Sequence, residues 1–130
     1  MTTSHFTARV YYEDTDFSGN VYHAAYLHFF ERARTEFLRE RGVHHSELVK
    51  DGIAFAVRTM TIDFKGAAHI DDLLEVSTEV ASTTPARLNL IQSIARDGVE
   101  LTRAEVQVVA IKTSGGVARM PRELIEMLKT

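Results

Sequence analysis

The sequence predicts an α+β domain in which a five-stranded antiparallel sheet is wrapped around one long central helix. Three observations predict it: one amphipathic helical stretch, several segments with period-two alternation, and short turns between the later segments. The expected order is one strand, the long helix and then four strands. A lone helix with a wide apolar face is unstable in water, so one sheet has to cover it.

The first two elements are expected in the first third of the chain. A strand is expected over 6–12, where four apolar or aromatic residues share one parity. Residues 21–41 follow as a helix of about five turns, because apolar residues recur at spacings of three and four and Gly42 offers a stop. The apolar positions of this helix are Tyr22, Tyr26, Phe29, Phe30, Ala33, Phe37 and Leu38.

Four further strands are expected after the helix. Apolar and polar residues alternate over 60–64, 74–80, 88–94 and 104–110. Three turn signals separate or end the last of these segments: Thr84-Pro85, Asp97-Gly98 and Ser114-Gly115-Gly116. Short connections favour antiparallel neighbours. Pro121 then opens a short terminal helix that we expect to run through Leu128.

Length and composition limit the classes of function. The chain has 130 residues, 45% of them hydrophobic, which is the size of a single domain over residues 1–130. It contains no cysteine, so thiolate catalysis and redox switches are excluded. A formal net charge of −3 gives no global attraction to nucleic acid. We expect small molecules or proteins as partners, and no nucleic acid.

The sequence also leads to expectations about self-association and about the cellular compartment. A sheet of five strands has exposed edges, and pairing between edges of two copies would cover them. The longest strongly apolar stretch, Val106–Ile111, is far shorter than the roughly 20 residues of a membrane-spanning helix, and residues 1–10 hold no apolar signal-peptide core. We expect a cytoplasmic protein with no integral membrane segment.

The densest cluster of reactive residues lies between the first strand and the long helix. Glu13, Asp14 and Asp16 place three carboxylates within four positions. The following helix start supplies free backbone N–H groups and a positive dipole end that suit an oxyanion. Asp16 and His23 are the candidates for proton transfer. Acidic residues before a helix are also common N-caps, so a purely structural role for this cluster stays open.

A resemblance favours catalysis. The run Val10-Tyr11-Tyr12-Glu13-Asp14-Thr15-Asp16, then Gly19, Val21-Tyr22-His23-Ala24, Tyr26 and 30–36, resembles the YbgC-like acyl-CoA thioesterases of the 4-hydroxybenzoyl-CoA thioesterase superfamily. The resemblance implies the hotdog fold, homodimers with two shared active sites, and often tetramers built from two dimers. It also implies an association with the Tol-Pal envelope system, in which relatives with this loop often take part.

The resemblance also assigns roles to residues. It places the catalytic carboxylate on Asp16, a histidine at the helix start on His23, and a tyrosine before the loop on Tyr12. In the implied mechanism the backbone N–H at His23 polarises the thioester carbonyl, while Asp16 attacks the carbonyl carbon or activates a water. Ala25 departs from the Asn or Ser that relatives usually have, which leaves the acyl preference, short-chain or aromatic, open.

Other candidates concern binding. Coenzyme A carries phosphates, for which Arg58, Arg87 and Lys65 are the candidate partners. Coenzyme A would be part of the substrate, so no cofactor is expected. No metal is expected either, because the neighbouring histidines of the segment His44-His45-Ser46-Glu47 diverge and indicate a surface turn. His5, His28 and His69 stand alone and receive no role.

Two alternatives remain beside hydrolysis. Related hotdog domains dehydrate hydroxyacyl thioesters, although with a different arrangement of Asp and His. The chain could also be a non-catalytic module that binds acyl thioesters or an acyl carrier protein. The helical arginines Arg32, Arg34, Arg39 and Arg41 offer a local basic surface for such a carrier, but exposed helical arginines more often pair with neighbouring glutamates.

Overall fold

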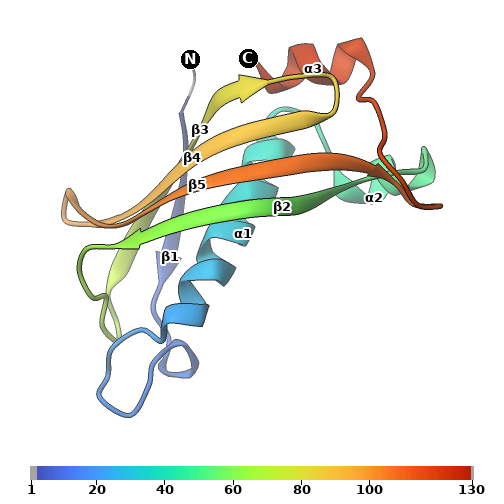
Figure 1. The fold of residues 1–130 in the computed structure, drawn as a ribbon. Coiled ribbons are helices and arrows are strands. Elements are labelled where there is room, and N and C mark those ends of the chain that lie inside the picture. The colour runs from blue at the N-terminus through green and yellow to red at the C-terminus, as the bar shows by residue number, and fades with distance from the viewer. Residues whose placement is uncertain (1–2, 130) are drawn as a thin grey trace.

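The computed structural model describes residues 3–129 and consists of one curved sheet around one long helix (Figure 1). The strands are β1 (Ser4–Arg9), β2 (Ile53–Phe64), β3 (Leu73–Thr83), β4 (Arg87–Arg96) and β5 (Val99–Lys112). The helices are α1 (His23–Glu40), α2 (His45–Lys50) and α3 (Arg122–Leu128), with a 3₁₀ turn η1 (Tyr12–Asp14) before α1.

The predicted fold class is confirmed. The five strands form one sheet in the order β1-β3-β4-β5-β2, and every pair is antiparallel. The sheet curves around α1, which crosses its inner face diagonally (Figure 1). The two edges of the sheet are therefore β1 and β2.

Several predicted boundaries were wrong, and three of them concern the site or the edge of the sheet. β1 ends at Arg9, so Tyr12 lies in η1 and not in the strand, because Val10 exchanges backbone hydrogen bonds with the 71–72 turn instead. The helix begins at His23 and not at residue 21. β2 begins at Ile53, seven residues before the expected 60. None of its 12 residues is fully buried, which explains why alternation did not mark the whole strand.

The segment around the paired histidines also differs from its prediction. Residues 45–50 form the short helix α2 and not a surface turn. His45 packs edge-on against the ring of Phe55, with 6.3 Å between the ring centroids. This contact ties α2 to the first residues of β2.

The core lies between α1 and the sheet. Phe30 and Phe37 of α1 are fully buried, and each buried side chain of this size contributes roughly 1.5–3 kcal/mol relative to exposure. On the sheet, the buried partners are mainly even-numbered residues of the central strands, which all point to the inner face. They are Leu74, Val76, Val80, Leu88, Leu90, Ile94, Ala104, Val106, Val108 and Ala110.

Gln92 is a fully buried polar residue that joins the helix to two strands. Gln92 of β4 donates from Nε2 to the Phe30 carbonyl at 3.0 Å and to Thr78 Oγ1 at 2.9 Å. Its Oε1 accepts a hydrogen bond from Arg34 at 3.0 Å. Both the nitrogen and the oxygen of the Gln92 amide therefore have hydrogen-bond partners, as buried amide groups require.

The start of α1 contacts the last residue of β2, Phe64, and the 67–72 segment. The hydroxyl of Tyr26 accepts a hydrogen bond from the buried backbone N–H of Ala68 at 2.9 Å. The Tyr26 ring also packs edge-on against Phe64, with 5.5 Å between centroids. Thus α1 begins beside the end of β2 and ends beside its beginning.

We expect Tyr26→Phe to lower the free energy of unfolding by about 1–3 kcal/mol, because the buried Ala68 N–H would lose its acceptor. Urea denaturation at a fixed protein concentration measures the change. Tyr22→Phe is the matched control: its ring is half exposed, so its effect should stay within about 0.5 kcal/mol. Equal stability of the two variants would contradict the role of the Tyr26 hydroxyl.

Candidate functional site

The segment between β1 and α1 is a compact loop fixed by its own backbone. η1 closes through hydrogen bonds from the Asp14 and Thr15 N–H groups to the Tyr11 and Tyr12 carbonyls, at 3.0 and 3.1 Å. The Asp14 carboxylate accepts the Tyr11 N–H at 2.9 Å and so caps this turn. Asp14 therefore has a structural role in η1 and does not cap α1.

Asp16 opens a second turn, which presents its carboxylate at the surface. The Asp16 N–H donates to the Asn20 carbonyl at 2.9 Å, and the Gly19 N–H donates to the Asp16 carbonyl at 3.1 Å. Gly19 has φ of 85°, which an L side chain rarely adopts. Ser18 donates to Asp16 Oδ1 from its hydroxyl at 2.5 Å and from its backbone N–H at 2.8 Å.

These hydrogen bonds set the charge of Asp16. The Ser18 hydroxyl, followed by the Ser18 N–H, lowers the pKa of the Asp16 carboxyl, and the Asn20 N–H acts in the same direction. Partial desolvation opposes them without reversing the direction. Asp16 is thus ionised at neutral pH, as a nucleophile or general base has to be.

The start of α1 keeps its hydrogen-bond donors available. The N-cap residue, Tyr22, makes no side-chain cap, and the Ala25 N–H already turns back to the Tyr22 carbonyl at 2.8 Å. Within residues 3–129 no acceptor is recorded for the N–H groups of His23 and Ala24. Two free donors at the positive end of an 18-residue helix suit a carbonyl oxygen that gains negative charge.

Tyr12 and His23 flank this loop from its two ends. Tyr12 lies in η1 with 80% of its surface exposed, and His23 is the first residue of α1. The His23 ring contacts that of Tyr22, with 4.4 Å between centroids. In the described part of the chain no hydrogen bond joins either side chain to Asp16. The structure brings the three residues into one region, but not into direct contact.

A neighbouring turn holds the loop in place. Residues 67–72 receive the loop through two backbone hydrogen bonds, from the Ile70 N–H to the Gly19 carbonyl at 3.1 Å and from the Val21 N–H to the Ala68 carbonyl at 2.8 Å. This turn connects β2 to β3. The Asp16 loop therefore depends on a segment that lies about 50 residues later in the sequence.

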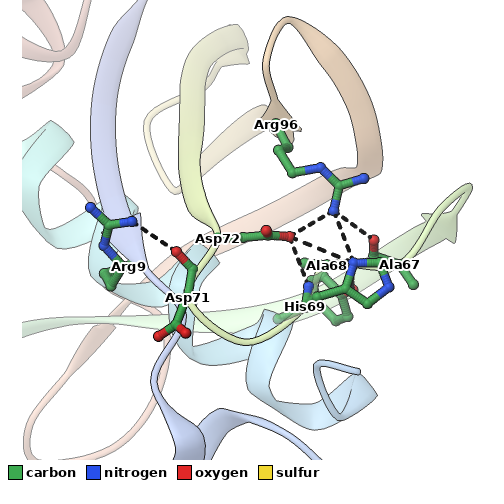
Figure 2. A network of polar contacts seen from close by, with 8 residues as sticks. Arg9, Ala67, Ala68, His69, Asp71, Asp72 and Arg96 are labelled. Carbon is green, nitrogen blue, oxygen red and sulfur yellow. Dashed lines mark hydrogen bonds and ion pairs between the residues drawn. The ribbon is translucent and has the colours of Figure 1, made fainter. Parts of the chain in front are cut away.

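Figure 2 shows the polar contacts that fix the 67–72 turn. Arg96, at the end of β4, donates to Asp72 Oδ2 at 2.6 Å and to the Ala67 carbonyl at 3.2 Å. The same Asp72 oxygen accepts the His69 N–H at 2.8 Å, and Arg9 donates to the Asp71 carbonyl at 2.8 Å. Partial burial opposes ionisation of Asp72, but the hydrogen bonds from Arg96 and His69 outweigh it and lower its pKa.

Sequence reasoning missed this network. Asp72, His69 and Arg96 have no periodic or motif signal that links them, because their contact arises only when β4 folds back beside the 67–72 turn. Asp71 has φ of 70°, a conformation that Asp tolerates better than most residues, so its residue type gives one local indication of a turn. It marks a turn, but it does not point to its partners.

A cavity of about 380 Å³ opens between α1 and the β2 side of the sheet. Its polar wall comes from Glu31, Arg34 and Thr35 of α1 and from His45. Its apolar wall comes from Leu38, Phe55, Ala56, Val57, Leu88, Leu90 and Val108. In one protomer this cavity is distant from Asp16, since Arg34 lies eleven residues, or roughly 16 Å, along α1 from His23.

The region around Asp16 exposes an unusual amount of aromatic surface. Tyr11, Tyr12 and Tyr22 are at least half exposed, and Phe17, next to Asp16, is fully exposed. Leu27 continues this surface along α1, and Phe64 continues it at the end of β2. Exposed aromatic and apolar groups that adjoin one another are typical of a surface that another molecule covers.

The candidate phosphate-binding residues lie apart from one another. Lys65 follows the end of β2, at the α1 start, and pairs with Glu100. Arg58 donates to Gln107 Oε1 at 3.0 Å, on the outer face of the sheet, since Gln107 alternates with buried residues of β5. Arg87 precedes the buried Leu88 and so also faces outward. Only Lys65 lies at the end of the sheet that carries Asp16.

Two further observations concern metals and membranes. In the part of the chain that the structure describes, no group of three or more His, Asp or Glu side chains could hold a metal ion. None of the helices described is both long and apolar enough to cross a membrane.

Comparisons with known proteins agree with this geometry. Residues 10–128 match the model of the thioesterase-like superfamily. The chain is 48% identical over 107 residues to the acyl-CoA thioesterase YbgC of Haemophilus influenzae, covering 82% of this chain and 79% of that protein. It is 45% identical over 104 residues to the acyl-CoA thioester hydrolase YbgC of Escherichia coli O157:H7, covering 79% and 78%.

Solved structures give the same result. A probable thioesterase from Bartonella henselae is 42% identical and has a TM-score of 0.87, covering 92% of this chain and all of that one. A hypothetical protein from Aquifex aeolicus, 25% identical, has a TM-score of 0.92 over 97% of this chain and 99% of that one. The chain therefore belongs to the thioesterase-like superfamily, in the family of the YbgC thioesterases, and is a thioester hydrolase with the hotdog fold.

Proposed function

We propose that this protein hydrolyses acyl-CoA thioesters to the free acid and coenzyme A, with Asp16 as nucleophile or general base. One observation carries the assignment to Asp16: an ionised carboxylate lies beside a helix start whose first N–H groups are free. The substrate class is supported by the names of the Haemophilus influenzae and Escherichia coli relatives. The acyl group is short-chain or aromatic in this proposal.

The proposed reaction uses the helix start and the carboxylate together. The thioester carbonyl oxygen accepts a hydrogen bond from the His23 N–H, which stabilises the negative charge that develops on it. Asp16 attacks the carbonyl carbon, or removes a proton from the water that does so. If Asp16 attacks, the carbon–sulfur bond breaks, the thiolate takes a proton from water, and a second water hydrolyses the acyl–Asp16 anhydride to the free acid and the Asp16 carboxylate. If Asp16 acts as a base, the water oxygen becomes part of the free acid, and the proton that Asp16 accepted passes to the leaving thiolate. Tyr12 and His23 border the space in which this occurs.

A second copy of the chain completes the site in this proposal. Among the described residues β2 pairs with β5 on one side and with no strand on the other, although it is 12 residues long. Its apolar residues Val57 and Phe64 are about half exposed. A long edge strand with exposed apolar residues favours pairing with an identical strand.

Antiparallel pairing of two β2 strands has a consequence for the site. Phe64, at the end of β2, contacts Tyr26 near the start of α1, whereas Phe55, near the beginning of β2, contacts α2 and lines the cavity. A twofold axis near the middle of β2 therefore brings the Asp16 loop of one copy to the cavity of the other. Asp16 and the acyl cavity then come from different subunits, and each dimer has two such sites.

The remaining expectations stay predictions. Lys65 is the phosphate contact that its position favours, while Arg58 and Arg87 could contribute only around the outer face of the sheet. Assembly of two dimers into a tetramer, a cytoplasmic location and the association with the Tol-Pal system are parts of the same proposal. An acyl carrier partner belongs to the alternative of a non-catalytic binding module and is not assigned.

We expect Asp16→Asn to reduce kcat/KM by about 10²- to 10⁴-fold while the KM changes little, because the amide can neither attack nor accept a proton. Release of free thiol from a panel of acyl-CoAs measures the rate. Asp97→Asn is the matched control, since Asp97 lies at the tip of the β4–β5 hairpin and Asn tolerates its φ of 51°. Near-normal turnover by Asp16→Asn on the best substrate would refute the role of Asp16.

The pH dependence tests the environment of the same carboxyl. Its pKa is lowered, so the ionised form is lost only when the pH falls below the ordinary range of a carboxyl group. Ser18→Ala removes the largest cause of the lowering, and the acidic limb of kcat/KM should therefore move to higher pH. Ser114→Ala, in the exposed turn after β5, should leave the limb in place. An unshifted limb in Ser18→Ala would show that another group controls it.

The dimer is tested by Leu27→Lys. Leu27 is 42% exposed on the β2 side of α1, so lysine should be tolerated in a single chain but would bury a charge between two copies. We expect a folded monomer by light scattering, with hydrolysis reduced at least tenfold because each site would lack the partner's cavity. Val99→Lys, at the β4–β5 hairpin, is the control and should remain a dimer. A monomeric wild type with full activity would contradict the shared site.

A further inference from the structure

Arg34 is a cation in the polar wall of the cavity, and it has one direct hydrogen-bond partner. It lies on α1 and donates to Oε1 of the buried Gln92 at 3.0 Å. Burial lowers the pKa of its guanidinium, and the charge of Glu31 opposes this without reversing it. Within residues 3–129 no carboxylate forms a direct ion pair with Arg34, and Gln92 is its one recorded hydrogen-bond acceptor.

A comparison with Arg41, the C-cap residue of the same helix, shows how unusual this is. Arg41 is also desolvated, but its guanidinium donates to Ser4 Oγ at 2.9 Å and to the Phe37 carbonyl at 3.1 Å. It lies over the Phe37 ring and within 3.9 Å of a Glu40 oxygen. Arg41 thus serves the stability of the helix end, whereas most of the five N–H donors of Arg34 are left for other partners.

The cavity gives these donors a defined direction. Arg34, Glu31 and Thr35 form its polar wall, opposite apolar side chains of β2, β4 and β5. Gln92 is fixed by the Phe30 carbonyl and Thr78, so it holds the guanidinium in one orientation. A cavity of about 380 Å³ with apolar walls and one oriented cation suits a short or ring-shaped group that carries an oxygen at its end.

We propose that Arg34 selects acyl groups whose far end carries a hydrogen-bond-accepting oxygen, a carboxylate or a hydroxyl, over acyl groups of the same size that end in hydrogen. This inference rests on the proposed function, because the cavity receives the acyl group only when the Asp16 loop of a second copy lies at its mouth. Arg34 is then a residue that determines specificity, and it takes no part in bond breaking.

The neighbouring Glu31 refines the choice between the two kinds of oxygen. Its carboxylate repels a terminal carboxylate but accepts a hydrogen bond from a hydroxyl, which both donates and accepts. Thr35 can donate to either, although its hydroxyl now binds the Glu31 carbonyl at 3.2 Å. A site built to bind an oxygen discriminates strongly against the analogue that lacks it, because its buried polar groups are then left unpaired.

The test compares matched pairs of substrates. Glutaryl-CoA is compared with pentanoyl-CoA for the carboxylate, and 4-hydroxybenzoyl-CoA with benzoyl-CoA for the hydroxyl, each rate being corrected for uncatalysed hydrolysis. For the wild type we expect kcat/KM to favour the oxygen-ended member of at least one pair by about 10- to 100-fold, the range for hydrogen bonds to a charged group. The pair with the larger ratio identifies which oxygen the site binds. Equal rates within both pairs would overturn the proposal.

The variant Arg34→Met should bring that ratio to within about twofold, because it removes the donors for the terminal oxygen. Arg34→Lys keeps a charge and a donor for Gln92 and should give an intermediate ratio. Arg39→Met is the control, since Arg39 lies on the same helix, is exposed and pairs with Glu36. The proposal is wrong if Arg34→Met keeps the wild-type ratio, or if it lowers all four rates equally and dissociates the dimer.

A binding measurement separates this proposal from the proposed function. Non-hydrolysable thioether analogues of the four substrates are titrated by calorimetry into the wild type and Arg34→Met. A wild-type preference for the oxygen-ended analogue that Arg34→Met loses supports the role of Arg34 even if no thioester is hydrolysed. Hydrolysis that depends on Asp16 but shows no preference supports the proposed function and refutes the role of Arg34.

Discussion

The fold depends on the burial of one aromatic helix face by one curved sheet. Phe30 and Phe37 of α1 are fully buried, and Gln92 ties the same helix to β3 and β4. A single helix is too narrow to cover five strands. α1 packs against β1 and β3, so the inner face of the sheet near β2 is left partly uncovered. The cavity beside β2 is therefore a consequence of how the core is built.

The same constraint determines where the reactive loop lies. The position of α1 is fixed at its start by Tyr26, which binds the 67–72 turn and packs on Phe64. The 67–72 turn also binds the Asp16 loop, through the Gly19 carbonyl and the Val21 N–H. Asp16 is thus positioned by backbone hydrogen bonds whose geometry depends on Arg96 and Asp72 at the end of the sheet. Rigidity at this site therefore depends on hydrogen-bonded turns as well as on the packing of Tyr26.

The sequence could predict what depends on local pattern. The period of three to four residues predicted α1, and the hairpin signals predicted the β4–β5 turn, because both follow from short-range geometry. Tyr12 was expected in β1 because its parity is correct, but the capping of η1 by Asp14 ends the strand earlier. The length of β2 was missed because an edge strand half covered on both faces has no clean alternation.

The parts of the site that sequence did not predict all depend on distant contacts. Asp16 and His23 could be named as candidates because they lie in one short motif. Arg34 looked like an exposed helical arginine that pairs with a glutamate. The folded chain instead shows that it binds Gln92, 58 positions later, and lines a cavity. The 67–72 turn and Arg96 likewise meet only in three dimensions. A short motif can supply candidate reacting groups, whereas candidates for positioning or selecting the substrate become visible only in the folded chain.

The lowered pKa of Asp16 limits what this carboxylate could contribute in the proposed mechanism. A carboxylate stabilised by Ser18 is readily ionised but correspondingly less basic, so it cannot supply the whole activation by itself. In the proposed mechanism the N–H groups at the start of α1 polarise the carbonyl, and such donors act strongly only where water is excluded. Phe17 and Tyr12 are open to solvent in one protomer. Covering them with the β2 side of a second copy would exclude that water, so the proposed dimer serves catalysis as well as stability.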